Sequence, residues 1–167
     1  MSWNKHRILG ALLALAAFAP LRADVHAGAA FPALASAGLA GDVPATAGQV
    51  LLVDFWASWC APCKASFPAF ARLHAAYAAR GLVIIAVSVD EDPAAYAAFV
   101  KKFAPPFATV RDATQQLVRT VNVPTMPTTY LVARDGQVRH VHSGFHGDET
   151  EKALRAEIEA LLAEKSS

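Results

Sequence analysis

The chain reads Leu51-Leu52-Val53-Asp54-Phe55-Trp56-Ala57-Ser58-Trp59-Cys60-Ala61-Pro62-Cys63-Lys64 at the stretch that decides its fold. Its only two cysteines follow a near-continuous apolar run, which is typical of a strand covered on both faces. Pro62 fits the first turn of a helix. The two cysteines are therefore predicted to lie where a buried strand ends and a helix begins. Thiols at this spacing can form a disulfide across a tight turn, and a helix N-terminus stabilises a thiolate.

The first residues have the layout of an export signal. A short basic region, residues 5–7, precedes the uncharged apolar stretch 8–19. This stretch is too short to span a bilayer comfortably. We expect a signal peptide over 1–23, with cleavage after Ala23 or after Ala27, and keep an uncleaved N-terminal anchor as the alternative.

Length and charge limit the remaining possibilities. Most of the 167 residues remain after the leader, enough for one domain with its own core. We expect a lead-in over 24–48, with a possible short hairpin around Gly41-Asp42, and one domain over 49–167. The net charge of +1 gives no reason to expect nucleic acid as a partner. A structural disulfide is disfavoured because so short a loop hardly constrains the unfolded chain, and zinc needs about four ligands.

Apolar runs and helix signals alternate along the chain. Strands are predicted at 49–55 and 82–89, on either side of a helix that begins near Pro62 and ends at Gly81. Asp92-Pro93 predicts a capped helix start, and the helix should continue to about residue 103. The later elements are a strand at 107–110, a helix at 114–121, a hairpin of strands 128–133 and 138–143, and a helix at 150–163. This order indicates an α/β sandwich with a mixed sheet.

On these residues the chain resembles the thioredoxin superfamily. Residues 53–64 resemble its active-site strand and turn, and residues 124–130 (Pro-Thr-Met-Pro-Thr-Thr-Tyr) resemble its second signature, where the proline is cis. The export signal and the extra strand-helix segment 82–121 resemble the TlpA/ResA branch of exported thiol-disulfide reductases. The resemblance implies a three-layer sandwich, with helices on both faces of a mixed central sheet and a TlpA-type central strand-helix insertion.

The two cysteines have distinct predicted roles. Cys60, at the helix entrance, is expected to be the attacking thiol, because backbone N–H groups and the helix dipole favour its thiolate. Cys63, one turn inward, is expected to resolve the mixed disulfide with a substrate. Pro62 should fix the turn between them. Trp59 is expected either to flank the reactive sulfur or simply to pack.

Asp54 carries a carboxylate in a strand predicted to be buried. Because burying an unpaired charge is costly, we expect its pKa to be raised and the group to be partly protonated. It would then accept and donate a proton for Cys63, whereas the structural alternative is that neighbouring hydrogen bonds merely satisfy it. Thioredoxins carry Asp at the matching place. Many TlpA/ResA relatives carry Asn there and a Glu three residues after the second cysteine, where this chain has Ser66.

The second signature supplies the remaining predicted site residues. By resemblance, Pro127 is cis and faces the cysteines, and an ordinary trans proline is the alternative. Met126 would offer backbone groups to an extended substrate segment. We expect no metal site. The histidines at 140, 142 and 146 are read as an exposed strand face, and the acidic run 90–92 as a helix cap and loop.

These residues favour an exported, periplasmic thiol-disulfide oxidoreductase that works as a monomeric reductant without a cofactor. Its expected partners are proteins with a disulfide or dithiol, for example apocytochromes in cytochrome c biogenesis, and a membrane-bound thiol reductase as electron donor. The Ala-Pro dipeptide between the cysteines is nearer to the Gly-Pro of thioredoxin than to the Pro-His of a strong oxidase. A disulfide oxidase or isomerase remains an alternative. A copper-binding chaperone that uses Cys60 and Cys63 as soft ligands is another.

Overall fold

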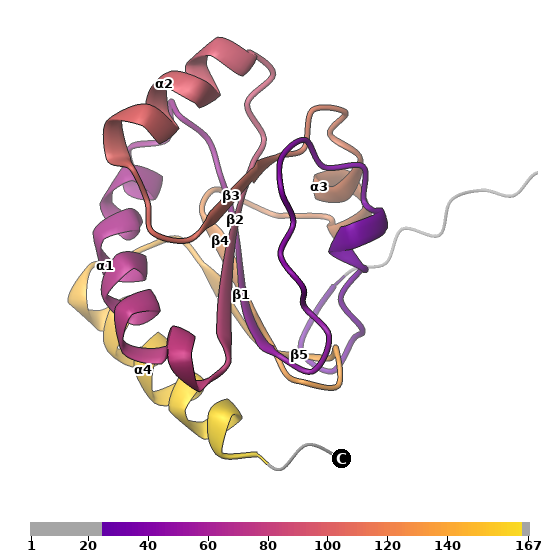
Figure 1. Ribbon diagram of the computed structural model, residues 1–167, viewed down its shortest axis with the longest axis vertical. Coiled ribbons are helices and arrows are strands. Elements are labelled where there is room, and N and C mark those ends of the chain that lie inside the picture. Colours follow the sequence, from indigo (N-terminus) through magenta and orange to yellow (C-terminus); the bar gives the residue numbers. More distant parts are fainter. Residues whose placement is uncertain (1–24, 165–167) are drawn as a thin grey trace, which may run out of the picture.

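The computed structural model describes residues 25–164, so the leader expected over 1–23 lies outside the described residues. Five strands form one mixed sheet in the order β3-β2-β1-β4-β5 (Figure 1). The strands are β1 (Val50–Trp56), β2 (Leu82–Ser88), β3 (Ala108–Arg111), β4 (Thr128–Val132) and β5 (Val138–Ser143). β1, β2 and β3 run parallel, whereas β4 is antiparallel to both β1 and β5. β1 is therefore the central strand, and all its residues are buried, as its near-continuous apolar run predicted.

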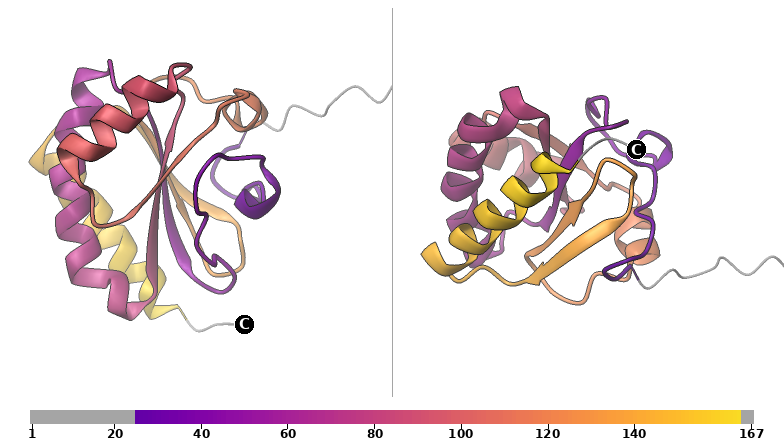
Figure 2. Two further views of the ribbon diagram at one scale, coloured as in Figure 1. Left: turned by 45° about the horizontal axis from the view of Figure 1, so that its top comes forward. Right: turned by 90° about the horizontal axis from the view of Figure 1, so that it is seen from below.

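Helices flank this sheet on both sides. They are α1 (Ala61–Tyr77), α2 (Pro93–Phe103), α3 (Gln116–Val121) and α4 (Asp148–Ala163), with the short 3₁₀ helices η1 (Leu34–Ser36) and η2 (Ala78–Arg80). α1, α2 and α4 cover one face, and α3 and η1 lie on the other (Figures 1 and 2). The predicted three-layer sandwich is thus confirmed, and the segment 82–121 supplies β2, α2, β3 and α3.

Aromatic packing holds the layers together. On the face under α1 and α2, the ring of Trp56 lies 5.0 Å from that of Phe67 and 4.3 Å from that of Phe99, measured between centroids. On the other face, the ring of Phe55 meets that of Tyr130 at 5.9 Å. Because adjacent residues of a strand point to opposite faces, Phe55 and Trp56, consecutive residues of β1, pack into the core on opposite sides of the sheet.

The helix ends follow local chemistry. Asp92 accepts a hydrogen bond from the Ala94 N–H at 2.8 Å, which is the predicted cap of α2. Gly81 has a φ of 101°, the left-handed conformation that glycine adopts without strain, and it ends η2. α3 begins at Gln116, two residues later than predicted. Its first turn is held by the buried Asp112, whose carboxylate accepts from the N–H groups of Gln116 and Val118.

The described part of the lead-in, residues 25–48, packs over the sheet. The ring of Phe31 lies 5.4 Å from that of Tyr130, and Leu34 in η1 is buried. The residues around Gly41-Asp42 form no hairpin. Instead, the backbone of Ala40 makes an isolated bridge with Arg111 on β3, the outermost strand on that side. This segment therefore completes the core.

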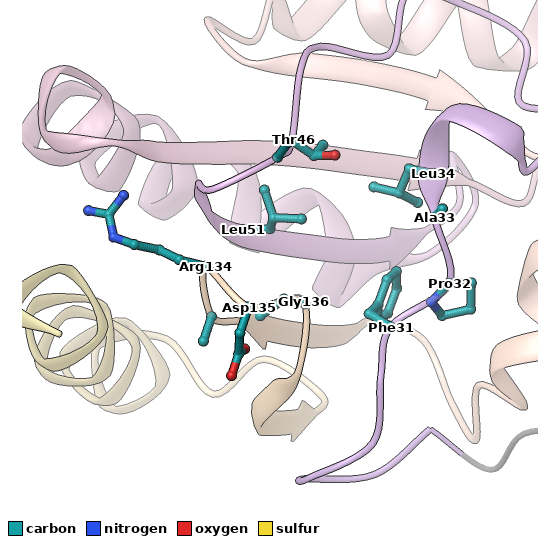
Figure 3. A pocket seen from close by; sticks show the side chains of 12 residues that line it. Phe31, Pro32, Ala33, Leu34, Thr46, Leu51, Arg134, Asp135 and Gly136 are labelled. Carbon is teal, nitrogen blue, oxygen red and sulfur yellow. The ribbon is translucent and has the colours of Figure 1, made fainter. Parts of the chain in front are cut away.

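A pocket of about 290 Å³ lies between the lead-in and the turn that joins β4 to β5 (Figure 3). Phe31, Leu34 and Leu51 line its apolar side, and the residues of the turn line the other. Leu51 stands near the start of β1, whereas the cysteines follow the end of that strand. The pocket is consequently at the opposite end of β1 from the cysteines. Among the described residues, no helix combines the length and apolar character needed to cross a membrane.

Candidate active site

Cys60 and Cys63 lie at the start of α1, directly after the turn that follows β1. Their sulfurs form a disulfide, and their Cα atoms are 5.3 Å apart. Cys60 is the N-cap residue, and its Sγ accepts a hydrogen bond from the N–H of Cys63 at 3.3 Å. Cys63 is fully buried, whereas Cys60 keeps 5% of its surface exposed. A partner can therefore reach only Cys60, the sulfur that receives the helix N–H group.

Asp54 lies in the middle of β1 and is completely buried. Strand alternation puts its side chain on the same face as Trp56, which packs against α1. The Thr129 hydroxyl donates a hydrogen bond to Asp54 Oδ1 at 2.7 Å. Oδ2 has no hydrogen-bond partner among the described residues. Asp54 thus combines full burial with a single donor, on the face that carries α1.

Burial raises the pKa of Asp54 to about 8, and the hydrogen bond from Thr129 offsets only part of that rise. A carboxyl with such a pKa can both hold and release a proton near neutral pH. Three residues beyond Cys63, Ser66 is buried and donates its hydroxyl to the Cys63 carbonyl oxygen at 2.8 Å. The position three residues after the second cysteine therefore supplies no carboxyl, and Asp54 is the buried one in β1.

The predicted second signature sits at the same edge of the sheet as the cysteines. Thr128, the first residue of β4, pairs with Phe55 near the end of β1. Met126 and Pro127 directly precede Thr128, so they lie where β1 leads into the cysteine turn. The Met126–Pro127 peptide bond is cis, and the Pro127 carbonyl oxygen accepts from the Gly144 N–H at 2.7 Å.

Trp59 precedes Cys60 and is 70% exposed. This exposure rules out the alternative that Trp59 is a packing residue of the core. Pro62 lies in the first turn of α1, between the two cysteines, as its position in the sequence predicted. An exposed tryptophan thus precedes Cys60 along the chain, and a rigid proline separates the two cysteines.

Asp90 is a residue of this region that the sequence reading missed. It is buried, and its carboxylate accepts hydrogen bonds from the Ser58 N–H, the Ser58 hydroxyl and the Ser88 hydroxyl. The acidic run 90–92 was expected to form a cap and a loop. Asp92 does cap α2, but Asp90 instead accepts hydrogen bonds from Ser58, in the turn that leads to Trp59 and Cys60. The position of Asp90 directly after a buried strand was the one available signal.

Two of the three histidines predicted to form an exposed strand face, His140 and His142, are instead paired through their rings with a helix, whereas His146 is exposed beyond the end of β5. His142 Nε2 lies 2.6 Å from Glu157 Oε2, and His140 Nδ1 lies 3.3 Å from Glu157 Oε1. His146 donates its backbone N–H to the Thr150 hydroxyl at the start of α4. Within residues 25–164, no group of three or more His, Cys, Asp or Glu side chains is arranged to hold a metal ion.

The sheet order, the cis proline and the disulfide at a helix start define a thioredoxin-like protein. Residues 26–158 match the Redoxin family, and the chain belongs to that family. Among solved structures, a Chlorobium tepidum chain described as a thiol:disulfide interchange protein DsbE superposes with a TM-score of 0.76 at 32% identity. That alignment covers 83% of this chain and 99% of the other. The resemblance predicted from the two motifs is thereby confirmed.

Sequence relatives agree with this assignment. The thiol-disulfide oxidoreductase ResA of Bacillus subtilis is 34% identical over 97 residues, and that of Geobacillus kaustophilus is 32% identical over 97 residues. Each match covers 58% of this chain, and 54% and 56% of the respective relative. The chain therefore spans little more than half the length of these ResA proteins. StoA of Bacillus subtilis shares the fold at 25% identity, with a TM-score of 0.58 over 65% of this chain and 84% of StoA.

Proposed function

We propose that this protein is an exported thiol-disulfide oxidoreductase that reduces disulfides of partner proteins through Cys60 and Cys63. The observation that carries the proposal is the disulfide at the start of α1, in which only Cys60 keeps any exposure. A dithiol used for exchange needs one sulfur within reach of a partner and a second one protected behind it. The relatives described as thiol-disulfide oxidoreductases, at about a third identity, support the same chemistry.

The reaction begins from the reduced dithiol. The Cys60 thiolate attacks one sulfur of the partner's disulfide, that S–S bond breaks, and the leaving partner thiolate takes up a proton. Cys63 then loses its proton and attacks the Cys60 sulfur. This step releases the second partner thiolate, which is protonated in turn, and forms the Cys60–Cys63 disulfide. Two electrons have then passed from the protein to its partner, and the two protons that the partner takes up balance the one that Cys60 released to solvent on forming its thiolate and the one that Cys63 lost.

Asp54 is proposed to serve the second step. Cys63 is fully buried, so its thiol cannot pass its proton directly to water, and a buried carboxylate whose raised pKa approaches that of a thiol is a better acceptor than an ordinary one. A carboxyl with a pKa of about 8 on the face of β1 that carries α1 meets this need. Trp59, Met126 and cis Pro127 are proposed to contact the partner's chain beside Cys60, the last two from the start of β4.

Two features of the sequence support the proposed direction of electron flow. Ala61-Pro62 resembles a reductant's dipeptide, and Asp54 occupies the thioredoxin-like place. Each turnover leaves the disulfide, so a dithiol donor must reduce it again. Because the leader is predicted to export the chain, we propose a membrane-bound thiol reductase as that donor. We further propose that the protein works in the periplasm as a monomer.

The reduction potential tests this proposal. The protein would be equilibrated in graded thiol–disulfide buffers and followed by the fluorescence of Trp56 and Trp59. We expect a potential near about −250 mV or below, as for a thioredoxin-like reductant. A value of about −120 to −180 mV would contradict the proposed direction and identify an oxidase or isomerase instead.

A further inference from the structure

The segment that carries Trp59 and Cys60 is a turn outside any helix or strand. Residues 57–59 connect the end of β1 to the start of α1, and the turn is closed by a bond from the Cys60 N–H to the Ala57 carbonyl at 3.1 Å. Trp59 stands on this turn with 70% of its surface exposed. The packing of its own side chain therefore does little to hold it, and its position depends on the backbone beneath it.

A buried carboxylate just beyond the end of the neighbouring strand, β2, holds that backbone. Asp90, which is 3% exposed, accepts from the Ser58 N–H at 3.1 and 3.0 Å, one distance to each oxygen. The Ser58 hydroxyl donates to Oδ1 at 2.8 Å, and the Ser88 hydroxyl donates to Oδ2 at 2.8 Å. Both oxygens are therefore engaged at once by donors. An asparagine has one acceptor oxygen and turns its NH₂ group toward these donors, so it cannot reproduce the arrangement.

The backbone at Val89 and Asp90 is itself held by three further hydrogen bonds. The Val89 N–H donates to the Trp56 carbonyl at 2.9 Å, and the Gln115 side chain donates to the Val89 carbonyl at 2.6 Å. Arg111 on β3 donates to the Asp90 carbonyl at 3.3 Å. A rigid support thus runs from β3 and the start of α3 through Asp90 to the turn at Ser58.

We infer that Asp90 is a positioning residue for disulfide exchange, which fixes the Ser58 turn so that Trp59 presents its indole beside Cys60 to a partner protein. This inference rests on the proposed function. Exchange with a protein disulfide depends on contacts beyond the reacting sulfurs, whereas exchange with a small disulfide uses few of them. The loss of Asp90 should consequently affect the two kinds of substrate unequally.

The test compares two oxidants of the reduced protein, insulin and glutathione disulfide. We expect Asp90→Asn and Trp59→Ala each to slow exchange with insulin about tenfold, as for loss of an interface anchor. The double variant should be no slower than the slower single one, because both changes remove the same contact. Asp90→Asn should slow exchange with glutathione disulfide by less than about twofold, since few contacts are lost there. Asp92→Asn, a neighbour that only caps α2, is the matched control.

Several outcomes would overturn the inference. In the first, the rate losses of the two single variants multiply in the double variant. In the second, Asp90→Asn slows exchange with both oxidants equally, and in the third it does not slow exchange with insulin at all. Amide hydrogen exchange gives a readout apart from activity. Without the carboxylate, the Ser58 amide should exchange at least about tenfold faster, while amides of β1 keep their protection. An unchanged exchange rate of the Ser58 amide would contradict the inference that Asp90 holds the turn.

A second variant keeps the test independent of how well Asp90→Asn folds. Ser88→Ala removes one donor from Oδ2 and the acceptor of the Asp90 N–H, but leaves the Ser58 bonds in place, so it should give the same pattern with smaller changes. Failure of the proposed function looks different. In that case wild-type protein exchanges with neither oxidant, and the Ser58 amide rates still decide whether Asp90 holds the turn.

Discussion

Two buried aspartates, Asp54 in the middle of β1 and Asp90 directly after β2, have opposite hydrogen-bonding environments. Asp54 has one hydrogen-bond donor, Thr129, and one oxygen without a partner among the described residues. Asp90 has donors on both oxygens, from Ser58 and Ser88. Both side chains are almost fully removed from water. Burial alone therefore does not decide what a carboxyl does. The number of donors around it separates a group suited to proton transfer from one suited to holding a turn.

The largest expected effect is on the pH dependence of stability. The pKa of Asp54 is about 8 in the folded protein and close to 3.8 when unfolded, so only the folded state holds this proton between those values. Its stabilising contribution is complete below about pH 4 and is lost as the pH rises to about 8. The free energy of unfolding should fall by about 1.4 kcal/mol per pH unit in that window.

Urea unfolding at several pH values measures this slope, with Asp54→Asn as the reference. The variant should lack the Asp54 contribution, and at pH 7 it should be more stable than wild type by about 4 kcal/mol. Parallel pH profiles for the two proteins would show that Asp54 does not titrate in this range. The comparison with Asp90 would then lose its basis.

The second effect is on turnover. Asp54→Asn should slow catalytic reduction of insulin about 100-fold at pH 7, because Cys63 loses its proton acceptor. The same change made in a Cys63→Ser background should leave the rate of mixed-disulfide formation at Cys60 unchanged. Non-reducing gels and stopped-flow fluorescence follow the two rates. An equal slowing in both backgrounds would mean that Asp54 acts on Cys60 instead.

The third effect has the opposite sign to the first. Asp90→Ala should lower the free energy of unfolding by about 2–4 kcal/mol, because the Ser58 N–H and hydroxyl lose their buried acceptor. Asp92→Ala, which removes an exposed helix cap two residues away, should cost only about 1 kcal/mol. Urea unfolding of both variants at pH 7 makes the comparison. Equal losses would show that the Asp90 bonds are no more important than a surface cap.

The smallest effect tests the single donor of Asp54. Thr129→Val removes the hydrogen bond that lowers the Asp54 pKa, so the pH window of falling stability should extend above 8. The loss of the bond itself should cost about 1 kcal/mol. Thr128→Val is the matched control, since the Thr128 hydroxyl donates to the Thr125 carbonyl and not to Asp54. A shift of the window in the control as well would point to repacking of β4.

Sequence reasoning reached Asp54 and missed Asp90 for a physical reason. A carboxylate inside an apolar run is conspicuous, because the run predicts a buried strand and the charge contradicts it. Asp90 follows its strand and starts an acidic run, where a capping or loop residue is the ordinary expectation. The partner that gives Asp90 its role, Ser58, is 32 residues away along the chain. No local pattern connects the two.

The same limit applies to element boundaries and to the lead-in. β5 was predicted to the residue, because alternation and a tight turn are local signals. α3 starts two residues late, where Asp112, directly after β3, accepts hydrogen bonds from the N–H groups of its first turn. The lead-in was expected to hold a possible hairpin, but Ala40 pairs with Arg111 on β3. That partner is available only once the sheet exists.

By itself the sequence determined the order of strands and helices, the strand-to-helix position of Cys60 and Cys63, and the burial of Asp54. All three depend on residues that are neighbours along the chain, through periodicity, turn chemistry and helix caps. Only the tertiary structure decided that Asp54 has one donor while Asp90 has donors on both oxygens, and that Trp59 stands exposed on a clamped turn. Hydrogen bonds between strands join residues far apart in sequence, and the packing of the sheet alone selects which of them meet.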